Sequence, residues 1–323
     1  MKAIVYDAYG EPEMLRTEEV DEPQPRKGEV LLRVRAVEAT KANCELRSFR
    51  FAVSWFRWPL RFLWGIRKPR NRILGSYFAG EVMGLGEGVE RFSLGDRVFG
   101  CGQLRMRAYA EFAVYPENYT IAKMPEGLAF ARAAASLLGG LNALHFLNLG
   151  GASEGERVLI NGGGESIGLM AIQIAKARGA DVVAVDKEAK RSVILKAGAD
   201  RFIDFRRERF EGQDDRYDVI FNMVPEASFA ACVRCLKPGG RYLMGNPKFL
   251  DMLKASLLPL DHGKKARFAF AGETQVDLEQ LSQLIDAGEV SPVVDRVLSF
   301  ERAAEAHRLV ESEERTGVIV LEP

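Results

Sequence analysis

A run of small residues between an apolar strand and an apolar helix constrains the fold of this chain more than any other feature. A strand predicted at Val158 to Asn161 leads into the sequence GGGESIG at residues 162–168, and an apolar helix is predicted over residues 167–178. Glycine permits a tight turn and a close approach of the backbone to a ligand, and the amides at a helix N-terminus attract negative charge. This layout is typical of a loop that holds the pyrophosphate of a dinucleotide.

The sequence around this loop alternates between strands and helices. Further strands are predicted at residues 181–185, 201–204, 218–223 and 241–245, with helices at 187–197 and 227–236. Repeated βαβ units predict a parallel sheet with helices on both faces. Asp186 ends the second strand, 18 residues after Gly168, where its carboxylate can accept hydrogen bonds from ribose hydroxyls.

The first 120 residues have a different pattern, because they are rich in strands and in glycine turns. Strands are predicted at residues 1–6, 29–37, 97–99 and 111–114, with turns at 86–88 and 94–96. This spacing is typical of a compact antiparallel module. Near the end of the chain, helices at 276–287 and 300–311 precede a strand at 317–321.

Length and composition exclude several classes of protein. A chain of 323 residues with 47% apolar residues is long enough for about two domains of ~100–200 residues each. Its 45 basic and 45 acidic residues give no overall attraction to nucleic acid or to an anionic membrane. Four scattered cysteines, no pattern of a secretory signal and no run of about 18 apolar residues lead us to expect a cytoplasmic protein without a transmembrane segment.

Stretches spread over nearly the whole chain resemble, in the same order, the medium-chain dehydrogenase/reductase superfamily. They are VLINGGGESIGLMAIQIAKARGADVVAVD at 158–186, GSYFAGEVMG at 75–84, AYAEFAVYPENY at 108–119, and AGEVSPVVDRVLSF at 287–300. The branch that the chain resembles most is that of the zinc-free quinone oxidoreductase-like reductases. The resemblance implies an α/β fold in which a GroES-like, mostly-β catalytic domain (residues 1–123 and 273–323) accompanies a Rossmann coenzyme domain with a doubly wound parallel sheet (residues 124–272).

The same resemblance implies an activity. The chain is expected to be an NAD(P)H-dependent oxidoreductase that transfers hydride to a small apolar carbonyl acceptor such as a quinone or an enone, without zinc. We expect a small-molecule substrate, a homodimer and no nucleic-acid partner. The alternative is a nucleotide-binding sensor or accessory protein of the same fold with little turnover.

The residues argue against a metal. Zinc-bearing relatives carry a ligand in a Gly-His-Glu triplet, which aligns with Gly75-Ser76-Tyr77, and neither serine nor tyrosine replaces an imidazole ligand. Cys44 and Cys101 stand alone, so a four-cysteine zinc loop is missing. The three histidines are far apart in the sequence, and we interpret them as helix-surface or core residues: they are His145, His262 and His307. The CxxC pair, Cys232 and Cys235, lies on a predicted helix without a second pair, and we interpret it as a buried or half-buried thiol pair.

Two features of the coenzyme region depart from the family pattern. Glu165 replaces the second glycine of the loop and brings a carboxylate near the expected pyrophosphate. Because like charges repel in a partly dry cleft, this side chain must turn away, meet a cation or weaken binding. In addition, Asn222-Met223-Val224-Pro225 stands where relatives have a glycine after the fourth strand.

The residues give opposite indications about which of the two nicotinamide coenzymes binds. Asp186 favours NAD(H), because a carboxylate repels a 2′-phosphate. Lys187, Lys190 and Arg191 follow at once, and they either bind that phosphate or form a solvated first turn of a helix. We favour NADP(H) slightly, because most relatives in this branch use it. The predicted cofactor-binding residues are Asn142, Gly162, Gly163, Gly164, Glu165, Ser166, Ile167, Gly168, Asp186, Lys187, Arg191, Asn222, Val224 and Gly245.

Without zinc, hydrogen-bond donors must stabilise the oxygen on which charge develops. The candidates are Thr40 and Asn43, which align near the catalytic-site turn of relatives, and Tyr77 in the former ligand triplet. Each of these catalytic candidates is equally well interpreted as a structural turn or core residue. Asn142 aligns with a position near the nicotinamide in relatives.

A segment at residues 47–70 is aromatic and basic, with seven basic residues and no acidic one. It holds all three tryptophans of the chain, Trp55, Trp58 and Trp64. Four aromatic residues spaced 4, 3 and 4 apart are predicted to share one face of a helix that begins or kinks at Pro59: they are Phe51, Trp55, Trp58 and Phe62. The segment is interpreted as a lid or wall of the substrate cleft, a subunit contact, a membrane-surface anchor or a contact to nucleic acid.

Overall fold

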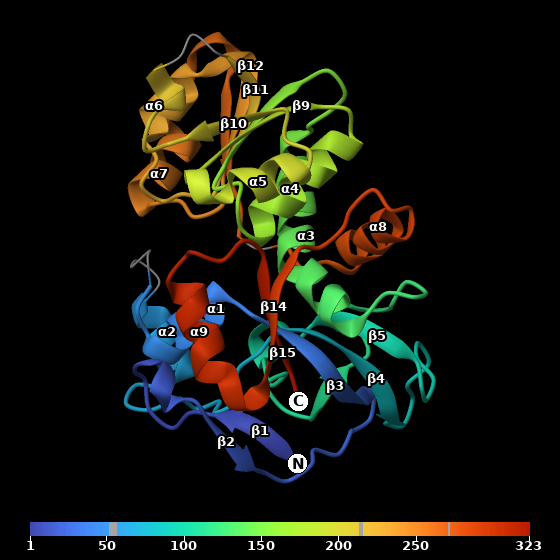
Figure 1. Ribbon diagram of the computed structural model, residues 1–323. Helices are drawn as coiled ribbons and strands as arrows, with labels where there is room; N and C mark the ends of the chain where they lie inside the picture. Colours follow the sequence, from blue (N-terminus) through green and yellow to red (C-terminus); the bar gives the residue numbers. More distant parts are fainter. Residues whose placement is uncertain (52–56, 213–215, 271) are drawn as a thin grey trace. The chain divides into compact units, whose positions relative to one another are not determined.

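The fold was analysed in a computed structural model, which describes residues 1–51, 57–212, 216–270 and 272–323 (Figure 1). The chain forms two compact units. The first comprises Met1–Leu137, Glu273–Asp286 and Pro292–Pro323, and the second comprises Leu138–Gly272 and Ala287–Ser291. One sheet is mixed and the other is parallel, which confirms the predicted α/β fold with a GroES-like part and a Rossmann part.

The first unit is built on a mixed sheet with the order β14-β15-β3-β4-β5-β7, in which β6 also pairs with β3. These strands are β3 (Glu29–Ala39), β4 (Tyr77–Leu85), β5 (Arg97–Cys101), β6 (Phe112–Pro116), β7 (Ile121–Lys123), β14 (Val294–Ser299) and β15 (Val318–Glu322). All pairs are antiparallel except β14 with β15. A separate antiparallel hairpin joins β1 (Lys2–Val5) to β2 (Arg16–Glu19). In Figure 1 the red C-terminal strands lie beside the blue β3.

The described residues of the first unit also form four complete helices and three 3-10 turns. They are α1 (Lys41–Ser48), α2 (Arg57–Trp64), α8 (Gln275–Asp286) and α9 (Ala303–Glu311), together with the 3-10 turns η1 (Pro12–Met14), η2 (Gln103–Arg105) and η6 (Phe300–Arg302). The core combines alternate residues of β3, such as Val30, Leu32 and Val34, with Ala306 and Val310 of α9. This two-residue periodicity in β3 is the pattern that predicted the strand.

The second unit is built on a parallel sheet with the order β10-β9-β8-β11-β12-β13. Its strands are β8 (Arg157–Asn161), β9 (Asp181–Asp186), β10 (Arg201–Asp204), β11 (Tyr217–Asn222), β12 (Leu236–Met244) and β13 (Lys265–Phe268). The chain moves outward from β8 to β10 and then returns to place β11 beside β8. Open parallel sheets bind ligands beyond the carboxyl ends of the strands where the order reverses. The glycine loop follows β8, so it lies at this switch point.

Helices of the second unit connect these strands. They are α4 (Ser166–Ala177), α5 (Arg191–Lys196), α6 (Phe229–Arg234) and α7 (Phe249–Leu257), with η3 (Glu188–Lys190), η4 (Phe210–Gly212) and η5 (Asp261–Gly263). The helix predicted over residues 187–197 is wrong in its first turn, because η3 precedes α5. A long helix that the sequence analysis did not predict, α3 (Phe130–Gly150), contributes residues to both units.

The aromatic and basic segment forms the short helix α2 rather than one helix that carries all four aromatic residues. Pro59 lies in the first turn of α2, where a missing N–H removes no hydrogen bond. Phe51 precedes the helix and packs edge-to-face on Phe49, with ring centroids 5.1 Å apart. Trp55 lies outside the described residues. Trp58 is 74% exposed, whereas Trp64 is buried in the core of the first unit.

None of the described helices is both long enough and apolar enough to cross a bilayer.

Candidate active site

The glycine loop is held against the sheet by its backbone. Gly162 has a φ of +92°, a left-handed conformation that favours glycine. The N–H groups of Gly162 and Gly163 both donate to the Val185 carbonyl, at 3.0 and 3.1 Å. A Cβ on Gly168 would lie 2.2 Å from the Gly162 carbonyl oxygen, so only glycine lets α4 pack this close to the loop. Glycine at 162 therefore permits the turn, and glycine at 168 permits the close packing of α4 on it.

The N-terminus of α4 has no side-chain cap. Glu165 occupies the N-cap position, but its side chain makes no capping hydrogen bond. The first amides of a helix have no partner within the helix, so those at the start of α4 remain available to a ligand. The buried Ser166 Oγ also has no hydrogen-bond partner among the described residues. Uncapped amides and an orphaned hydroxyl fit an anionic group such as a pyrophosphate.

Asp186 ties the loop to the end of β9. Its Oδ2 accepts the Gly164 N–H at 2.8 Å, and its Oδ1 accepts the Lys187 N–H at 2.8 Å. A carboxylate offers about four lone-pair sites, so two remain for other donors. Asp186 is 8% exposed, and its carboxylate already has a structural role in the loop.

A buried cation meets the unusual glutamate of the loop. Lys190 Nζ lies 3.0 Å from Glu165 Oε1, and the Lys190 side chain is only 3% exposed. A Cβ on Gly164 would lie 2.4 Å from Lys190 Cδ, so the lysine stem packs directly against the loop. Lys187 is half-buried, and Arg191 is exposed and lies 3.4 Å from Glu188. The Glu165 carboxylate was expected to turn away, to meet a cation or to weaken binding. In the structure it meets a cation, Lys190.

The ends of β8 and β11 are joined by two asparagines. Asn161 Nδ2 donates to Asn222 Oδ1 at 2.8 Å, and Asn222 Nδ2 donates to Tyr242 Oη at 3.1 Å. Asn222 also accepts the Val224 N–H and donates to the Val224 carbonyl, which fixes the turn after β11. A Cβ on Gly245 would lie 2.3 Å from the Met223 sulfur, so that side chain fills the space beside the glycine.

Asn142 lies on α3 and is buried. Its Nδ2 donates to the Leu138 carbonyl one turn earlier, at 2.9 Å.

Thr40 and Asn43 form the N-terminal cap of α1. Thr40 Oγ1 accepts the Asn43 N–H at 3.1 Å, and Asn43 Oδ1 accepts the Thr40 N–H at 3.3 Å. This reciprocal arrangement is a capping box, and both residues are buried. Asn43 Oδ1 also accepts the Tyr109 hydroxyl at 3.3 Å. Thr40 Oγ1 accepts in the capping box, so its own hydroxyl proton remains to be donated.

Tyr77 begins β4, and its hydroxyl donates to Glu273 Oε1. Burial, followed by the nearby Glu273 charge, raises the pKa of Tyr77 well above its ordinary value. The neighbouring Ser76 Oγ donates to the Gln103 carbonyl at 3.1 Å and lies 3.5 Å from the Cys101 sulfur. The triplet at 75–77 is therefore bound into hydrogen bonds of the first unit, and the Tyr77 proton is committed to a carboxylate.

With this geometry established, comparisons with known proteins identify the family. Residues 26–126 match the family model described as an alcohol dehydrogenase GroES-like domain, and residues 197–321 match the one described as a zinc-binding dehydrogenase. The quinone oxidoreductase of Rattus norvegicus is 29% identical, over 99% of this chain and 97% of that protein. The solved quinone oxidoreductase of Coxiella burnetii has a TM-score of 0.88 at 25% identity, and the match covers 100% of this chain and 99% of that one.

The chain belongs to the medium-chain dehydrogenase/reductase superfamily, in its quinone oxidoreductase-like branch. The 2-methylene-furan-3-one reductase of Solanum lycopersicum is a further relative, 28% identical over 100% of this chain and 79% of that protein. These relatives are named as oxidoreductases, and a further one, the NADPH-dependent alkenal/one oxidoreductase of Arabidopsis thaliana, is named for a nicotinamide coenzyme, which supports the use of NAD(P)H by this chain.

In the part of the chain that the structure describes, no three histidine, cysteine, aspartate or glutamate side chains are arranged to hold a metal ion. Cys232 and Cys235 are buried free thiols, in agreement with the sequence interpretation. Burial raises the pKa of Cys232 to about 12, so it is a poor thiolate donor at neutral pH.

A buried polar network near α1 was missed by the sequence analysis. His307 on α9 is fully buried, and its Nε2 lies 3.1 Å from the Tyr109 hydroxyl, which in turn contacts Asn43. Burial, and then the charge of Arg47, lower the pKa of His307 to about 3. Sequence spacing gave no signal for this network, because 198 residues separate Tyr109 from His307.

Proposed function

We propose that this chain is an NAD(P)H-dependent reductase that transfers hydride to a small, apolar, conjugated carbonyl acceptor, such as a quinone or an enone, without zinc. The observation that carries the proposal is the uncapped N-terminus of α4, which follows the glycine loop at the switch point of the parallel sheet. The names of three relatives support the acceptor class, because quinone, 2-methylene-furan-3-one and alkenal/one all denote conjugated carbonyl compounds.

The coenzyme would be held by groups that the loop leaves available. The first amides of α4 and the Ser166 hydroxyl would receive the pyrophosphate, and the two remaining lone-pair sites of Asp186 would receive ribose hydroxyls. Lys187 and Arg191 follow Asp186 and would favour a 2′-phosphate, so we slightly favour NADP(H) over NAD(H). When bound, the nicotinamide supplies the hydride, and the protein supplies orientation and a dry environment.

The side chain best suited to assist the acceptor oxygen is Thr40. Hydride addition places negative charge on that oxygen, which a positioned hydrogen-bond donor stabilises. Thr40 retains a hydroxyl proton to donate, whereas the Tyr77 proton is committed to Glu273. Asn43 is the least suitable of the three candidates, because its amide nitrogen contacts the Met106 sulfur and its oxygen accepts two hydrogen bonds.

A second candidate function is a nucleotide-binding sensor or accessory protein with little turnover. Two observations favour it: Tyr77 is tied to Glu273, and Lys190 packs against Gly164 with its charge engaged by Glu165. In both contacts, a polar group that could act on a substrate or on a coenzyme, the Tyr77 hydroxyl or the Lys190 ammonium, is already bound to a carboxylate of the protein. The two candidates share the nucleotide site and differ in turnover.

We further propose that the protein acts in the cytoplasm as a homodimer. Strand β13 is at the edge of the parallel sheet, where its outer hydrogen-bonding groups can accept another strand. Apolar side chains on α7 are exposed in the single chain: they are Phe249, Leu250, Leu253 and Leu257.

Light scattering would measure the molecular mass of the protein in solution and so test the proposed dimer. Leu250→Asp with Leu257→Asp is expected to give a monomer, while Leu195→Asp, at an exposed position on α5, is expected to leave the dimer intact.

One pair of measurements tests the proposed activity. Purified protein is titrated with NADPH and with NADH, and the absorbance at 340 nm is then followed with quinones, enones and aldehydes. Binding with oxidation by quinones or enones would support the reductase. Binding without oxidation by any acceptor would favour the sensor, and failure to bind either nucleotide would overturn both candidates.

A further inference from the structure

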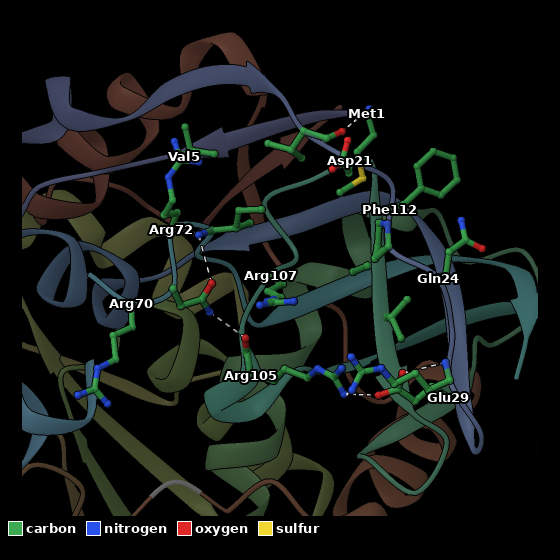
Figure 2. Close-up of a pocket in the computed structure, with 17 residues that line it drawn as sticks. Met1, Val5, Asp21, Gln24, Glu29, Arg70, Arg72, Arg105, Arg107 and Phe112 are labelled. Carbon is green, nitrogen blue, oxygen red and sulfur yellow. Dashed lines mark hydrogen bonds and ion pairs between the residues drawn. The ribbon is translucent and has the colours of Figure 1, made fainter. Parts of the chain in front are cut away.

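A cavity in the first unit lies among residues that no part of the proposed reaction uses. It has a volume of about 820 Å³ and is lined by the N-terminal hairpin, residues 20–29, residues 70–73, the loop at 105–107 and strand β6 (Figure 2). Cavities of this size hold drug-sized ligands in other proteins. None of the predicted coenzyme or catalytic residues lines it. A ligand here would therefore be distinct from substrate and coenzyme.

The lining of the cavity is amphipathic. Half-buried apolar side chains from three different segments contribute one part of the wall: Val20 after β2, Ile73 from the segment before β4, and Phe112 from β6. Arginines contribute the other part. Five arginines line the cavity, against two carboxylates, Asp21 and Glu29. Such a wall suits a ligand that has both an apolar body and a negative charge.

The arginines differ in how far they are already neutralised. Arg72 is held by Asp7 and Glu18, and Arg105 Nη1 lies 2.8 Å from Glu29 Oε1. Within the described ranges, the side chains of Arg26, Arg70 and Arg107 make no ion pair with a carboxylate, and Figure 2 shows the Arg70 side chain directed away from Arg107. Figure 2 shows the Arg107 guanidinium among the lining residues without an interaction line, whereas Arg105 is joined to Glu29. The Arg107 guanidinium therefore gives the cavity a positive charge that no carboxylate neutralises.

The backbone that carries Arg107 is strained. Met106 and Arg107 have φ values of +55° and +78°, in a region that residues with a side chain avoid. The surroundings hold this conformation, because the Tyr115 hydroxyl donates to the Met106 carbonyl at 2.6 Å and Asn71 Nδ2 donates to the Arg105 carbonyl at 3.0 Å. Glycine at position 107 would adopt the same φ without strain. An arginine there costs stability and makes no ion pair in return, which points to a ligand.

We propose that this cavity binds an amphipathic oxyanion, a carboxylate or phosphate group on an apolar body, with Arg107 on the anionic group. Guanidinium groups pair with carboxylate and phosphate oxygens in a planar, bidentate manner, while the apolar wall removes the body of the ligand from water. The site is independent of the proposed function, because it shares no residue with the glycine loop or with the catalytic candidates.

The test titrates the full-length protein with octanoate and with octyl phosphate by calorimetry, with octanamide as the uncharged probe. All three are used below their aggregation concentrations. At least one of the two anions is expected to bind the wild type, and at least tenfold more tightly than octanamide. The stronger anion identifies the group that the site prefers.

Arg107→Gly is the decisive variant, because it removes the guanidinium and also relieves the strain. It is expected to weaken anion binding at least tenfold while raising the midpoint of thermal unfolding. Lys27→Gln removes an exposed cation outside the cavity and is expected to leave binding unchanged.

Three results would overturn the proposal: no binding of either anion, equal binding of octanamide, or unchanged anion binding by Arg107→Gly. Anion binding that is lost in the presence of a quinone, but not in Arg107→Gly, would place the ligand in the active site and is also a refutation. The reductase activity of Arg107→Gly is measured in a separate assay. The anion-binding test therefore remains valid even if the protein shows no reductase activity.

Discussion

Lys190 and Glu165 form an ion pair beside the glycine loop, with Nζ and Oε1 3.0 Å apart and the lysine side chain almost fully buried. The pair joins the 3-10 turn after β9 to the N-cap of α4. It neutralises a carboxylate at the position where a dinucleotide would bring its phosphates. The loop therefore contains its own counter-charge, and a change to either member alters both the stability of the loop and its attraction for an anion.

Glu165→Gln is expected to leave the buried Lys190 ammonium without its carboxylate partner. Removing one partner of a buried pair costs about 3–5 kcal/mol, and the partial exposure of Glu165 reduces that here to about 1–3 kcal/mol. A bound phosphate would then replace the lost carboxylate, so NADPH is expected to bind more tightly. Calorimetry and thermal unfolding measure the two effects, with the surface variant Glu208→Gln as the control. Unchanged affinity would show that the pair does not face the coenzyme.

Asp186→Ser is expected to shift the preference toward NADPH. The substitution removes a negative charge that repels a 2′-phosphate, while the serine oxygen can still accept one of the two backbone N–H groups. The dissociation constants of NADPH and NADH give the preference as a ratio, and we expect that ratio to change about tenfold, equivalent to about 1.4 kcal/mol. An equal loss of affinity for both nucleotides would contradict the role of Asp186 on the ribose and leave only its role in the loop.

Thr40→Ala and Thr40→Ser separate capping from catalysis. Loss of an N-cap hydroxyl costs about 1 kcal/mol of stability, and serine caps a helix as well as threonine does. Thr40→Ser is therefore expected to retain both stability and kcat, whereas Thr40→Ala loses stability and about 10- to 1000-fold in kcat if the hydroxyl stabilises the acceptor oxygen. A drop in stability with kcat unchanged would restrict Thr40 to the capping box.

Tyr77→Phe tests whether the hydroxyl of this residue has a catalytic role. Its proton is donated to Glu273, and its raised pKa keeps it protonated throughout the ordinary pH range. We expect kcat to change less than threefold and the free energy of unfolding to fall by about 1–3 kcal/mol, because the half-buried Glu273 carboxylate loses a donor. A large fall in kcat without loss of stability would return Tyr77 to the catalytic candidates.

His307 predicts a pH dependence of stability. The folded state holds the pKa of His307 at about 3, below the ordinary value of 6.5, so the unfolded chain binds a proton that the folded chain excludes between these pH values. Stability therefore falls as the pH is lowered from about 6.5 to about 3, with a slope of up to about 1.4 kcal/mol per pH unit from this group. Urea unfolding at several pH values measures the slope. His307→Gln is expected to flatten it, and an identical slope in that variant would assign the effect to other groups.

The sequence predicted the parts of the fold that depend on local patterns. The turn at Gly162 and the close packing at Gly168 require glycine, so the loop is recognisable from the amino-acid sequence alone. The alternation of strands and helices likewise predicted the parallel sheet. Helix α3 was missed because it is apolar on all sides and has no amphipathic period.

Side-chain partners depend on the fold and were less predictable. Lys190 was expected either to bind a 2′-phosphate or to lie in a solvated first turn of a helix, but its side chain is buried and pairs with Glu165. The Tyr77 and Glu273 contact joins residues 196 positions apart, and no sequence pattern links them. The residues proposed to bind coenzyme and substrate remain predictions, and the variants above test them one at a time.

The position of β15 affects the order in which the two sheets can form during translation. The strand lies between β14 and β3, and it pairs Ile319 with Ala39 near the two ends of the chain. All strands of the parallel sheet, by contrast, are synthesised between residues 157 and 268. The coenzyme-binding sheet can therefore assemble while translation continues, whereas the mixed sheet of the first unit stays incomplete until β15 has emerged from the exit tunnel.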